Sequence, residues 1–135
     1  MGMLIGAVIA AGVLGSLTDW LFMGVLFHSA YNTFPEIWKP GIRDGNEKSA
    51  IIWASLIGLV MAAAVIALCA IVGVGDVMGG LGIALLVWIA GPLPVLVING
   101  FFVKIDPRIT FSHCLGYLVR LLIAGAAAGV ALPLS

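Results

Sequence analysis

The sequence predicts an all-α membrane protein, a bundle of four transmembrane helices, from its composition and its length. Hydrophobic residues make up 63% of the chain, charged residues make up 9%, and the mean hydropathy is +1.25. A soluble domain would contain about a quarter charged residues. Because a helix that spans a lipid bilayer needs roughly 20 mostly apolar residues, the 135 residues accommodate four spans in one domain, residues 1–135.

The first two predicted spans are uninterrupted apolar runs. The first covers roughly residues 3–27, has no basic segment before it, and is too long for a signal-peptide core, so we interpret it as a retained helix. A polar, aromatic loop follows at 28–49. The second span covers roughly residues 50–74 and leads into a tight glycine-rich turn, residues 75–80, that contains Asp76.

The third predicted span covers roughly residues 81–103 and contains Pro92 and Pro94. A proline inside a helix removes a backbone hydrogen bond, so an interruption is expected there. A short loop, residues 104–112, leads to the fourth span, roughly residues 113–132.

The basic residues outside the spans predict the orientation. All of them lie in the two loops that share one side, and the opposite side has none. Cytoplasmic loops carry an excess of Lys and Arg, so we expect loops 28–49 and 104–112 in the cytoplasm and both termini on the non-cytoplasmic side, in a bacterial inner (cytoplasmic) membrane. The basic loop residues are Lys39, Arg43, Lys48, Lys104 and Arg108.

Two ionisable residues, Asp19 and Arg120, lie inside predicted spans. A charge in hydrocarbon is costly, so it needs a partner, a wet cavity or a function. Asp19 lies about 12 Å and Arg120 about 10 Å from the loop ends of their antiparallel helices, so we expect them to pair. The other members of the predicted buried polar network lie in the same half of the bundle: Tyr117, His113, Asn99 and Ser55.

The opposite half of the predicted bundle contains almost no polar side chains. Water has no groups to hold it there, so we expect no continuous polar path across one copy of the chain. The pattern argues against a simple channel and leaves either a pocket open to the loop side or a dry network.

Aromatic and small residues predict contacts with the membrane interface and between helices. Aromatic rings at helical spacing beside a lysine suit a short interfacial segment, and small residues four apart let helices approach closely. The small residues suit packing within the chain or an oligomer face equally. The expected interface anchors are Tyr31, Phe34, Trp38 and Lys39, and the expected packing glycines are Gly58, Gly125 and Gly129.

The sequence contains no motif of an enzyme, a cofactor site or a metal centre, such as GxSxG, CxxC, HxxH or HExxH. His28, His113 and Cys114 are weak metal candidates near one membrane face. Cys69 and Cys114 differ in depth by about 27 Å, which is too far for a disulfide. A formal net charge of zero without a dense basic patch argues against nucleic-acid binding.

Several aromatic and glycine positions form a pattern that covers most of the chain. They are Trp20–Phe27 followed by Trp38, Phe101 and Phe102 before the basic loop, and Gly116 with Tyr117. In these positions the chain resembles a family of small bacterial four-helix membrane proteins known only as a domain of unknown function. That family usually has Tyr and Pro where this chain has Leu21 and Val25. The resemblance implies four spans and no assigned activity.

We therefore expect a non-enzymatic small integral membrane protein that packs as a homo-oligomer or as an accessory subunit of a larger membrane complex. The alternative is a small ion- or proton-coupled transporter or channel that uses the Asp19 and Arg120 pair. The apolar half of the bundle favours the first, and the intramembrane charges favour the second. The expected partners are the lipid bilayer and other membrane subunits or copies of the chain, without a cofactor.

Overall fold

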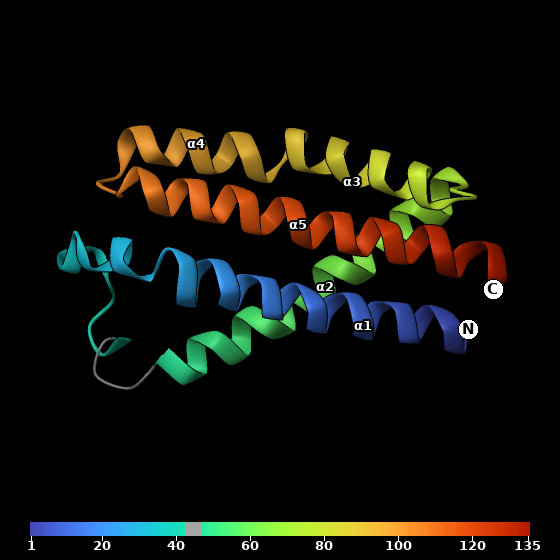
Figure 1. Ribbon diagram of the computed structural model, residues 1–135, viewed down its shortest axis with the longest axis horizontal. Helices are drawn as coiled ribbons and strands as arrows, with labels where there is room; N and C mark the ends of the chain where they lie inside the picture. The colour runs from blue at the N-terminus through green and yellow to red at the C-terminus, as the bar shows by residue number, and fades with distance from the viewer. Residues whose placement is uncertain (43–46) are drawn as a thin grey trace.

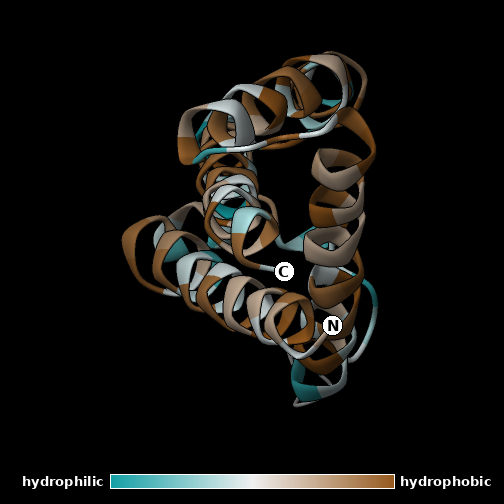
Figure 2. Cartoon of the chain, turned by 90° about the vertical axis from the view of Figure 1, so that its right-hand side faces the viewer, coloured by the Kyte–Doolittle hydropathy of each residue, from teal (hydrophilic) through white to brown (hydrophobic). Residues whose placement is uncertain are grey.

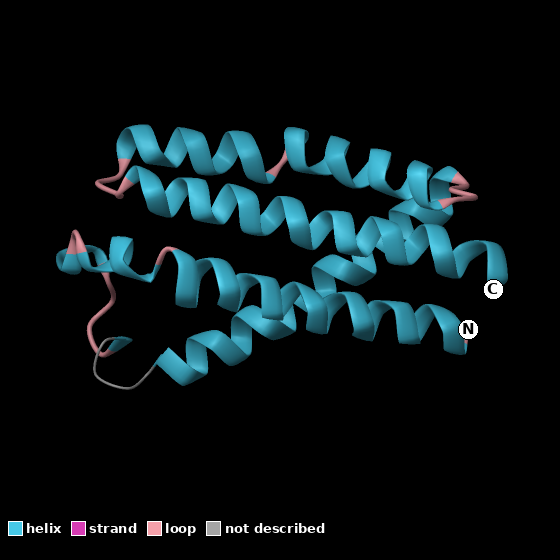
Figure 3. Cartoon of the chain, in the orientation of Figure 1, coloured by secondary structure: helices cyan, strands magenta, loops and turns pink. Residues whose placement is uncertain are grey.

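The computed structural model describes residues 1–42 and 47–135, which form helices joined by short turns (Figure 1, Figure 3). Four helices are long and apolar enough to cross a membrane, and the described residues contain no strand. The predicted all-α membrane fold with four spans is confirmed. Arg43, one of the basic loop residues, lies outside the described residues. The spans are Gly2–Leu26, Glu47–Val72, Val77–Phe102 and Pro107–Leu134.

The chain runs back and forth between two ends of the bundle (Figure 1). Both termini and the turn at residues 73–76 lie at the terminal end, and residues 27–42 and 103–106 lie at the loop end. In order, the elements are α1 (Gly2–Asp19), the π-helical η1 (Trp20–Leu26), the 3-10 turns η2 (His28–Asn32) and η3 (Pro35–Ile37), α2 (Glu47–Val72), α3 (Val77–Ala90), α4 (Pro92–Phe102), α5 (Pro107–Ala131) and the 3-10 turn η5 (Leu132–Leu134).

Helix α5 is the centre of the bundle. It packs against α1 and α3 along most of its length and also contacts α2 and α4. In the end-on view of Figure 2 the C-terminus lies among the other helices, whose surfaces are mostly apolar. A central helix must tolerate neighbours on several faces, and α5 does so with small residues on its second half, including Ala124, Gly125, Ala128 and Gly129.

Close backbone contact joins α3 to α5 near the terminal end. A Cβ atom at Gly125 would overlap the carbonyl of Gly80 and approach Ala84, and one at Gly129 would overlap the carbonyl of Asp76. Both predicted packing glycines therefore serve contacts within the chain. The surrounding core is built from small and aliphatic side chains: Ala11, Ala62, Val65, Ile66, Cys69, Ala84, Leu121, Ala124 and Ala128.

Three span boundaries differ from the predicted ones, two of them because capping residues extend the helices. Asp106 caps the N-terminus of α5 by accepting from the Arg108 backbone N–H at 2.9 Å, so this helix begins at Pro107 rather than near residue 113. Asp76 caps α3 in the same way at 2.7 Å through Gly79, so most of the predicted turn is helical. Helix α2 begins at Glu47 rather than near residue 50.

The predicted interruption of the third span occurs at Gly91, between α3 and α4. Pro92 and Pro94 lie in the first turn of α4, where proline is tolerated because those backbone positions have no helical acceptor. Next to the break, the Trp88 indole donates to the Cys114 carbonyl at 2.9 Å. The break therefore lies close to α5.

The aromatic segment after α1, predicted as a short interfacial segment with rings at helical spacing, does not form one continuous helix. The chain forms two separate 3-10 turns, η2 and η3, because Pro35 starts a new turn. Tyr31 and Trp38 still meet: their rings stack at 5.5 Å between centroids, and the Trp38 indole donates to the Tyr31 carbonyl at 2.9 Å. Phe34 lies beneath the Lys104 ammonium at 4.4 Å, whereas Lys39 is exposed.

The first three turns of α2 stand apart from the rest of the bundle. Every residue from 47 to 57 is exposed except Ser55, which is half-buried. Helix α2 crosses the bundle obliquely, so only its second half, from Gly58 onward, reaches the core (Figure 1). Ile51, Ile52 and Trp53 consequently present a large apolar surface in a single copy of the chain.

Candidate functional site

The structure brings Asp19 and Arg120 together. Nη1 of Arg120 lies 2.8 Å from Oδ2 of Asp19, and the exposed fractions of the side chains are 7% for Arg120 and 23% for Asp19. Arg120 extends from the middle of α5, and Asp19 is the last residue of α1 before the π-helical η1. π-helical turns inside α-helices are frequent at functional sites, which makes this pair the first candidate.

Two glycines make room for the guanidinium. A Cβ atom at Gly15 of α1 would lie 2.7 Å from Nε of Arg120, and a Cβ atom at Gly58 of α2 would overlap Nη2. The Arg120 side chain therefore occupies a slot between α1 and α2 that only glycine leaves open. Gly58 was predicted to allow close helix packing, and here the space it leaves is filled by an arginine side chain.

The hydrogen bonds of this guanidinium are incomplete. Its Nη2 donates to Ser16 at a long 3.4 Å, and Ser16 in turn donates to the Gly12 carbonyl at 3.0 Å. Its Nε is buried and has no partner among the described residues. A buried arginine without a full set of acceptors depends strongly on the one carboxylate that it has.

The buried polar network is smaller than predicted. Asn99 is exposed and Ser55 is only half-buried, so neither joins the charge pair. Asn99 lies on α4, beyond the break at Gly91, and lines the loop-end groove, whereas Ser55 lies on the part of α2 that leaves the bundle. Tyr117 is half-buried and makes no hydrogen bond to Asp19 or Arg120 within the described residues.

His113 bonds to a residue that was predicted only as an interface anchor. The Tyr31 hydroxyl lies 3.0 Å from Nε2 of His113, so the loop after α1 is tied to the first half of α5. Burial raises the pKa of Tyr31 to about 12, against a lowering by the neighbouring Ser112 hydroxyl and with a smaller rise from Asp19. Ser112 was missed in the sequence, because a single serine on an apolar helix gives no signal of its neighbours.

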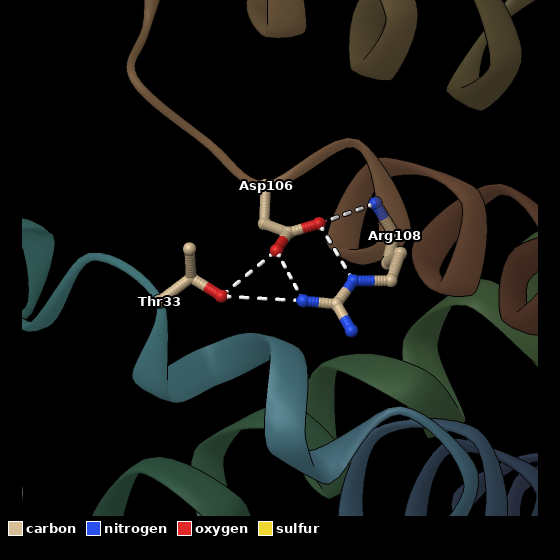
Figure 4. A network of polar contacts seen from close by, with 3 residues as sticks. All are labelled: Thr33, Asp106 and Arg108. Carbon is tan, nitrogen blue, oxygen red and sulfur yellow. Dashed lines mark hydrogen bonds and ion pairs between the residues drawn. The ribbon is translucent and has the colours of Figure 1, made fainter.

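A second polar cluster joins the two loops at the loop end (Figure 4). Asp106 accepts hydrogen bonds from the Arg108 side chain at 2.7 and 3.1 Å and from the Thr33 hydroxyl at 2.8 Å. These bonds, led by those from Arg108, hold the pKa of Asp106 well below its usual range. The sequence prediction missed Asp106, although an aspartate directly before Pro107 is a pattern that marks the start of a helix.

Close to this cluster, Lys104 bonds to Glu36 at 2.6 Å, and that bond lowers the pKa of Glu36. Both side chains are mostly exposed. This pair and the Asp106 cluster are contacts between loops.

Two shallow grooves lie beside the polar residues. One, of about 220 Å³, opens at the loop end between η3, α4 and α5, and its polar lining is Asn99, Thr110 and His113. The other, of about 240 Å³, lies between α1 and α2, and its polar lining is Ser16 and Ser55. Both walls are otherwise apolar.

The three weak metal candidates are not brought together. His28 is exposed, His113 faces Tyr31, and Cys114 is a buried free thiol. Within residues 1–42 and 47–135, no three His, Cys, Asp or Glu side chains are arranged to hold a metal ion. Cys69 is also buried and free.

A family model described as "Protein of unknown function (DUF1761)" matches residues 6–129. The chain belongs to this family. The match covers nearly the whole of all four spans and confirms the resemblance to a family of unknown function. No curated protein and no solved structure is significantly similar to the chain.

Proposed function

We propose that this DUF1761 protein is a non-enzymatic, small integral membrane protein with a structural role, and that the Asp19 and Arg120 pair locks its fold. The observation that carries the proposal is the arginine slot. Arg120 from α5 passes between Gly15 of α1 and Gly58 of α2 and meets Asp19. One side chain thus fixes three helices at their crossing, which is what a packing device requires.

The exposed first half of α2 supports a role within an assembly. In lipid, isolated helix surfaces are tolerated, but a helix that partly buries only one residue, Ser55, in its first three turns gains little from its own chain. We propose that this segment packs against a second copy or against another subunit of a larger membrane complex. The predicted glycine stripes do not support this role, because Gly58, Gly125 and Gly129 are used within the chain.

Native mass spectrometry of the gently solubilised protein tests the assembly directly, because it separates a monomer, a homo-oligomer and a subunit of a complex. Disulfide cross-linking adds the location. In a variant without Cys69 and Cys114, Ile52→Cys on α2 should cross-link, while the similarly exposed Leu86→Cys on α3 should not. A monomer in native mass spectra, with no cross-link at either position, contradicts the proposal.

We also propose that the loop end is cytoplasmic and that both termini lie outside. The support is the positive-inside rule applied to Lys39, Lys104 and Arg108, which all lie at the loop end. Cysteine labelling at Gly2 and Ser135 with a membrane-impermeant reagent should succeed from the outside. Labelling only from the cytoplasmic face reverses the orientation.

A second candidate function is ion- or proton-coupled transport. It is favoured by the charge pair inside the spanning helices and by the π-helical η1 that begins directly after Asp19. If Asp19 carries an ion or a proton, Asp19→Asn should abolish flux into liposomes while the helical content stays unchanged. We expect the wild type to show no flux above empty liposomes, since the half of the bundle beyond Arg120 is apolar. Saturable, pH-dependent uptake would favour transport over the structural role.

A further inference from the structure

The loop-end groove contains polar groups that the proposed structural role does not use. It has a volume of about 220 Å³, and Asn99, Thr110 and His113 supply its polar lining. Within the described residues, neither the Asn99 amide nor the Thr110 hydroxyl makes a hydrogen bond to the rest of the chain. All three side chains belong to spanning segments, where a polar group without a partner is costly. The groove is therefore a place where a ligand can complete these bonds.

The polar groups of the groove lie at two depths. Asn99 and Thr110 are each three residues from the loop ends of α4 and α5. The two helices approach closely here, because a Cβ atom at Gly100 would lie 3.2 Å from Oγ1 of Thr110. His113 follows Thr110 by three residues on the same face of α5, so it lies about 4.5 Å deeper. A ligand in the groove thus meets hydrogen-bonding groups at a shallow level and at a deeper one.

One ring nitrogen of His113 is left for a ligand. Nε2 lies 3.0 Å from the Tyr31 hydroxyl, and Nδ1 has no partner among the described residues. When the hydroxyl donates to Nε2, the neutral ring carries its proton on Nδ1 and can donate it to an oxygen atom. The Asn99 amide and the Thr110 hydroxyl can donate as well. The set therefore suits a ligand that offers oxygen acceptors at two points.

The walls of the groove favour a flat ligand without charge. None of its described lining residues is charged, so the lining lacks the Lys or Arg that would recognise a phosphate group. Trp38 forms part of the wall, and Tyr31 stacks on its indole at 5.5 Å between ring centroids, which holds the indole in place. A fixed aromatic wall offers a stacking surface for another ring. The aliphatic part of the wall consists of Ile37, Leu96, Ile105 and Ile109.

We propose that the loop-end groove binds the head group of a membrane quinone. A quinone ring is flat and uncharged, has two carbonyl oxygens on opposite sides of the ring, and reaches the protein from the lipid. One carbonyl accepts hydrogen bonds from Asn99 and Thr110, the other accepts from His113 about one helical turn deeper, and the ring lies against Trp38. Quinone binding is a function in addition to the proposed structural role.

The size of the groove fits the ring without its alkyl tail. Pockets that enclose a drug-sized molecule have volumes of roughly 300–1,000 Å³, and this groove is smaller. The ring therefore enters the groove, and the tail passes Leu96, which lies deeper on α4 than Asn99, into the lipid. A phospholipid also has carbonyl groups, but its charged phosphate would find no counter-charge in the lining.

Equilibrium binding of radiolabelled decyl-trimethylbenzoquinone to the protein in phosphatidylcholine nanodiscs tests this site. The amount retained by empty nanodiscs is subtracted. The wild type should bind the quinone saturably, with one molecule per chain. Thr110→Val and Asn99→Leu should each raise the Kd about three- to ten-fold, because each removes hydrogen-bonding groups and keeps the size of the side chain.

The matched control is Thr18→Val, the same change on α1, where the hydroxyl bonds to the Leu14 and Gly15 carbonyls and does not line the groove. It should leave the Kd unchanged. A second control changes the ligand: decyl-pentamethylbenzene has methyl groups in place of both carbonyls and nearly the same shape. It should bind the wild type at least about ten-fold more weakly than the quinone, because it accepts no hydrogen bond.

His113→Phe tests the deeper contact and should also raise the Kd. Circular dichroism checks the fold, and if this variant unfolds because Tyr31 loses its partner, Thr110→Val and Asn99→Leu carry the test. The absence of saturable binding above empty nanodiscs overturns the proposal. So do equal Kd values for the quinone and decyl-pentamethylbenzene, or a Kd that Thr18→Val raises as much as Thr110→Val. Displacement of the quinone by an equal concentration of dihexanoyl phosphatidylglycerol would also overturn it and would assign the groove to a phospholipid.

Discussion

The two halves of this bundle are held together by different kinds of contact. Toward the terminal end, α3 and α5 meet backbone to backbone through Gly80, Gly125 and Gly129, in a core of small apolar side chains. Toward the loop end, α5 is joined to its neighbours by polar pairs, chiefly Arg120 with Asp19 and His113 with Tyr31.

The two halves therefore show two ways of holding helices together: close packing in the terminal half and polar or charged contacts in the loop half. In lipid there is little hydrophobic drive between helices, so close van der Waals packing and polar contacts must hold them. The terminal half uses packing, which depends on the absence of a side chain. The loop half uses polar and charged side chains, and the strength of their contacts depends on pH and on the presence of a partner group. We therefore expect the loop half to respond to its environment and the terminal half to remain constant.

The largest effect should come from removing one member of the charge pair. Asp19→Ala leaves Arg120 buried without its carboxylate, and breaking a buried pair in this way typically costs about 3–5 kcal/mol of unfolding free energy. Arg120→Met should cost a similar amount. The double variant should lose less than the sum of the two, because its second substitution no longer removes a partner.

Equilibrium unfolding in mixed detergent micelles measures these free energies for the wild type, both single variants and the double variant. Additive losses in this cycle would show that the two side chains are neighbours without energetic coupling. The loop half would then resemble the terminal half, because van der Waals packing and not the ion pair would stabilise it.

The terminal half should break with a single added methyl group. Gly125→Ala places a Cβ against the carbonyl of Gly80 and the side chain of Ala84, so α3 must move away from α5. Overpacking of this kind costs about 1–3 kcal/mol. The same unfolding measurement applies, and unlike the charge pair this effect should not change with pH.

Gly82→Ala is the matched control on α3, since a Cβ at Gly82 meets nothing within 4 Å. Alanine favours the helix over glycine, so this variant should keep or raise the stability by up to about 1 kcal/mol. Equal losses at both glycines would mean that helix propensity, rather than contact with α5, determines the result.

The sequence predicts the number of spans and the depth of each residue in the membrane, but it does not predict which way a side chain faces around its helix. Four apolar runs predict four spans, and the position of a residue along its run gives its depth, which predicts that Asp19 and Arg120 lie at the same level. The direction in which a residue faces depends on breaks and neighbours. Depth alone places Asn99 in the polar network, but its side chain is exposed in the structure.

Glycines illustrate the same limit. A stripe of small residues predicts a close approach, and the sequence does not say what approaches. At Gly125 it is the backbone of α3, and at Gly58 it is the guanidinium of Arg120 from α5. Ser112 and Gly15 gave no signal, because their roles depend entirely on side chains that reach them from other helices.

A smaller effect is expected at Asp106, whose carboxylate can be protonated by lowering the pH. Asp106→Ala removes the cap of α5 and the bonds to Arg108 and Thr33, and should lower the Tm by about 3–6 °C. Asp106→Asn keeps a capping side chain and should lower it less. Thermal unfolding in detergent at several pH values measures both.

The pH dependence has a definite sign. Because the pKa of Asp106 is lowered in the folded protein, its charge contributes stability above the ordinary pKa of an aspartate, about 4. That contribution is lost as pH falls through the lower folded value. The difference in Tm between the wild type and Asp106→Asn should therefore be full at neutral pH and disappear in acid. If the difference in Tm persists in acid, then it comes from the shape of the side chain at position 106 and not from its charge.

The smallest effect is expected at Lys104 and Glu36, the shortest ion pair among the described residues of the loop half. Lys104 and Glu36 lie 2.6 Å apart, closer than Arg108 and Asp106 at 2.7 Å, yet more than half of each side chain is exposed. Water and salt screen exposed charges, and holding two long side chains in one geometry costs entropy. Glu36→Gln should leave the Tm unchanged at physiological salt, while Asp106→Asn, whose side chain is only 8% exposed, should not. Thermal unfolding of both variants at low and high salt compares them. If Glu36→Gln lowers the Tm as much as Asp106→Asn, then the distance between charges, rather than their burial, determines the stability of the loop half.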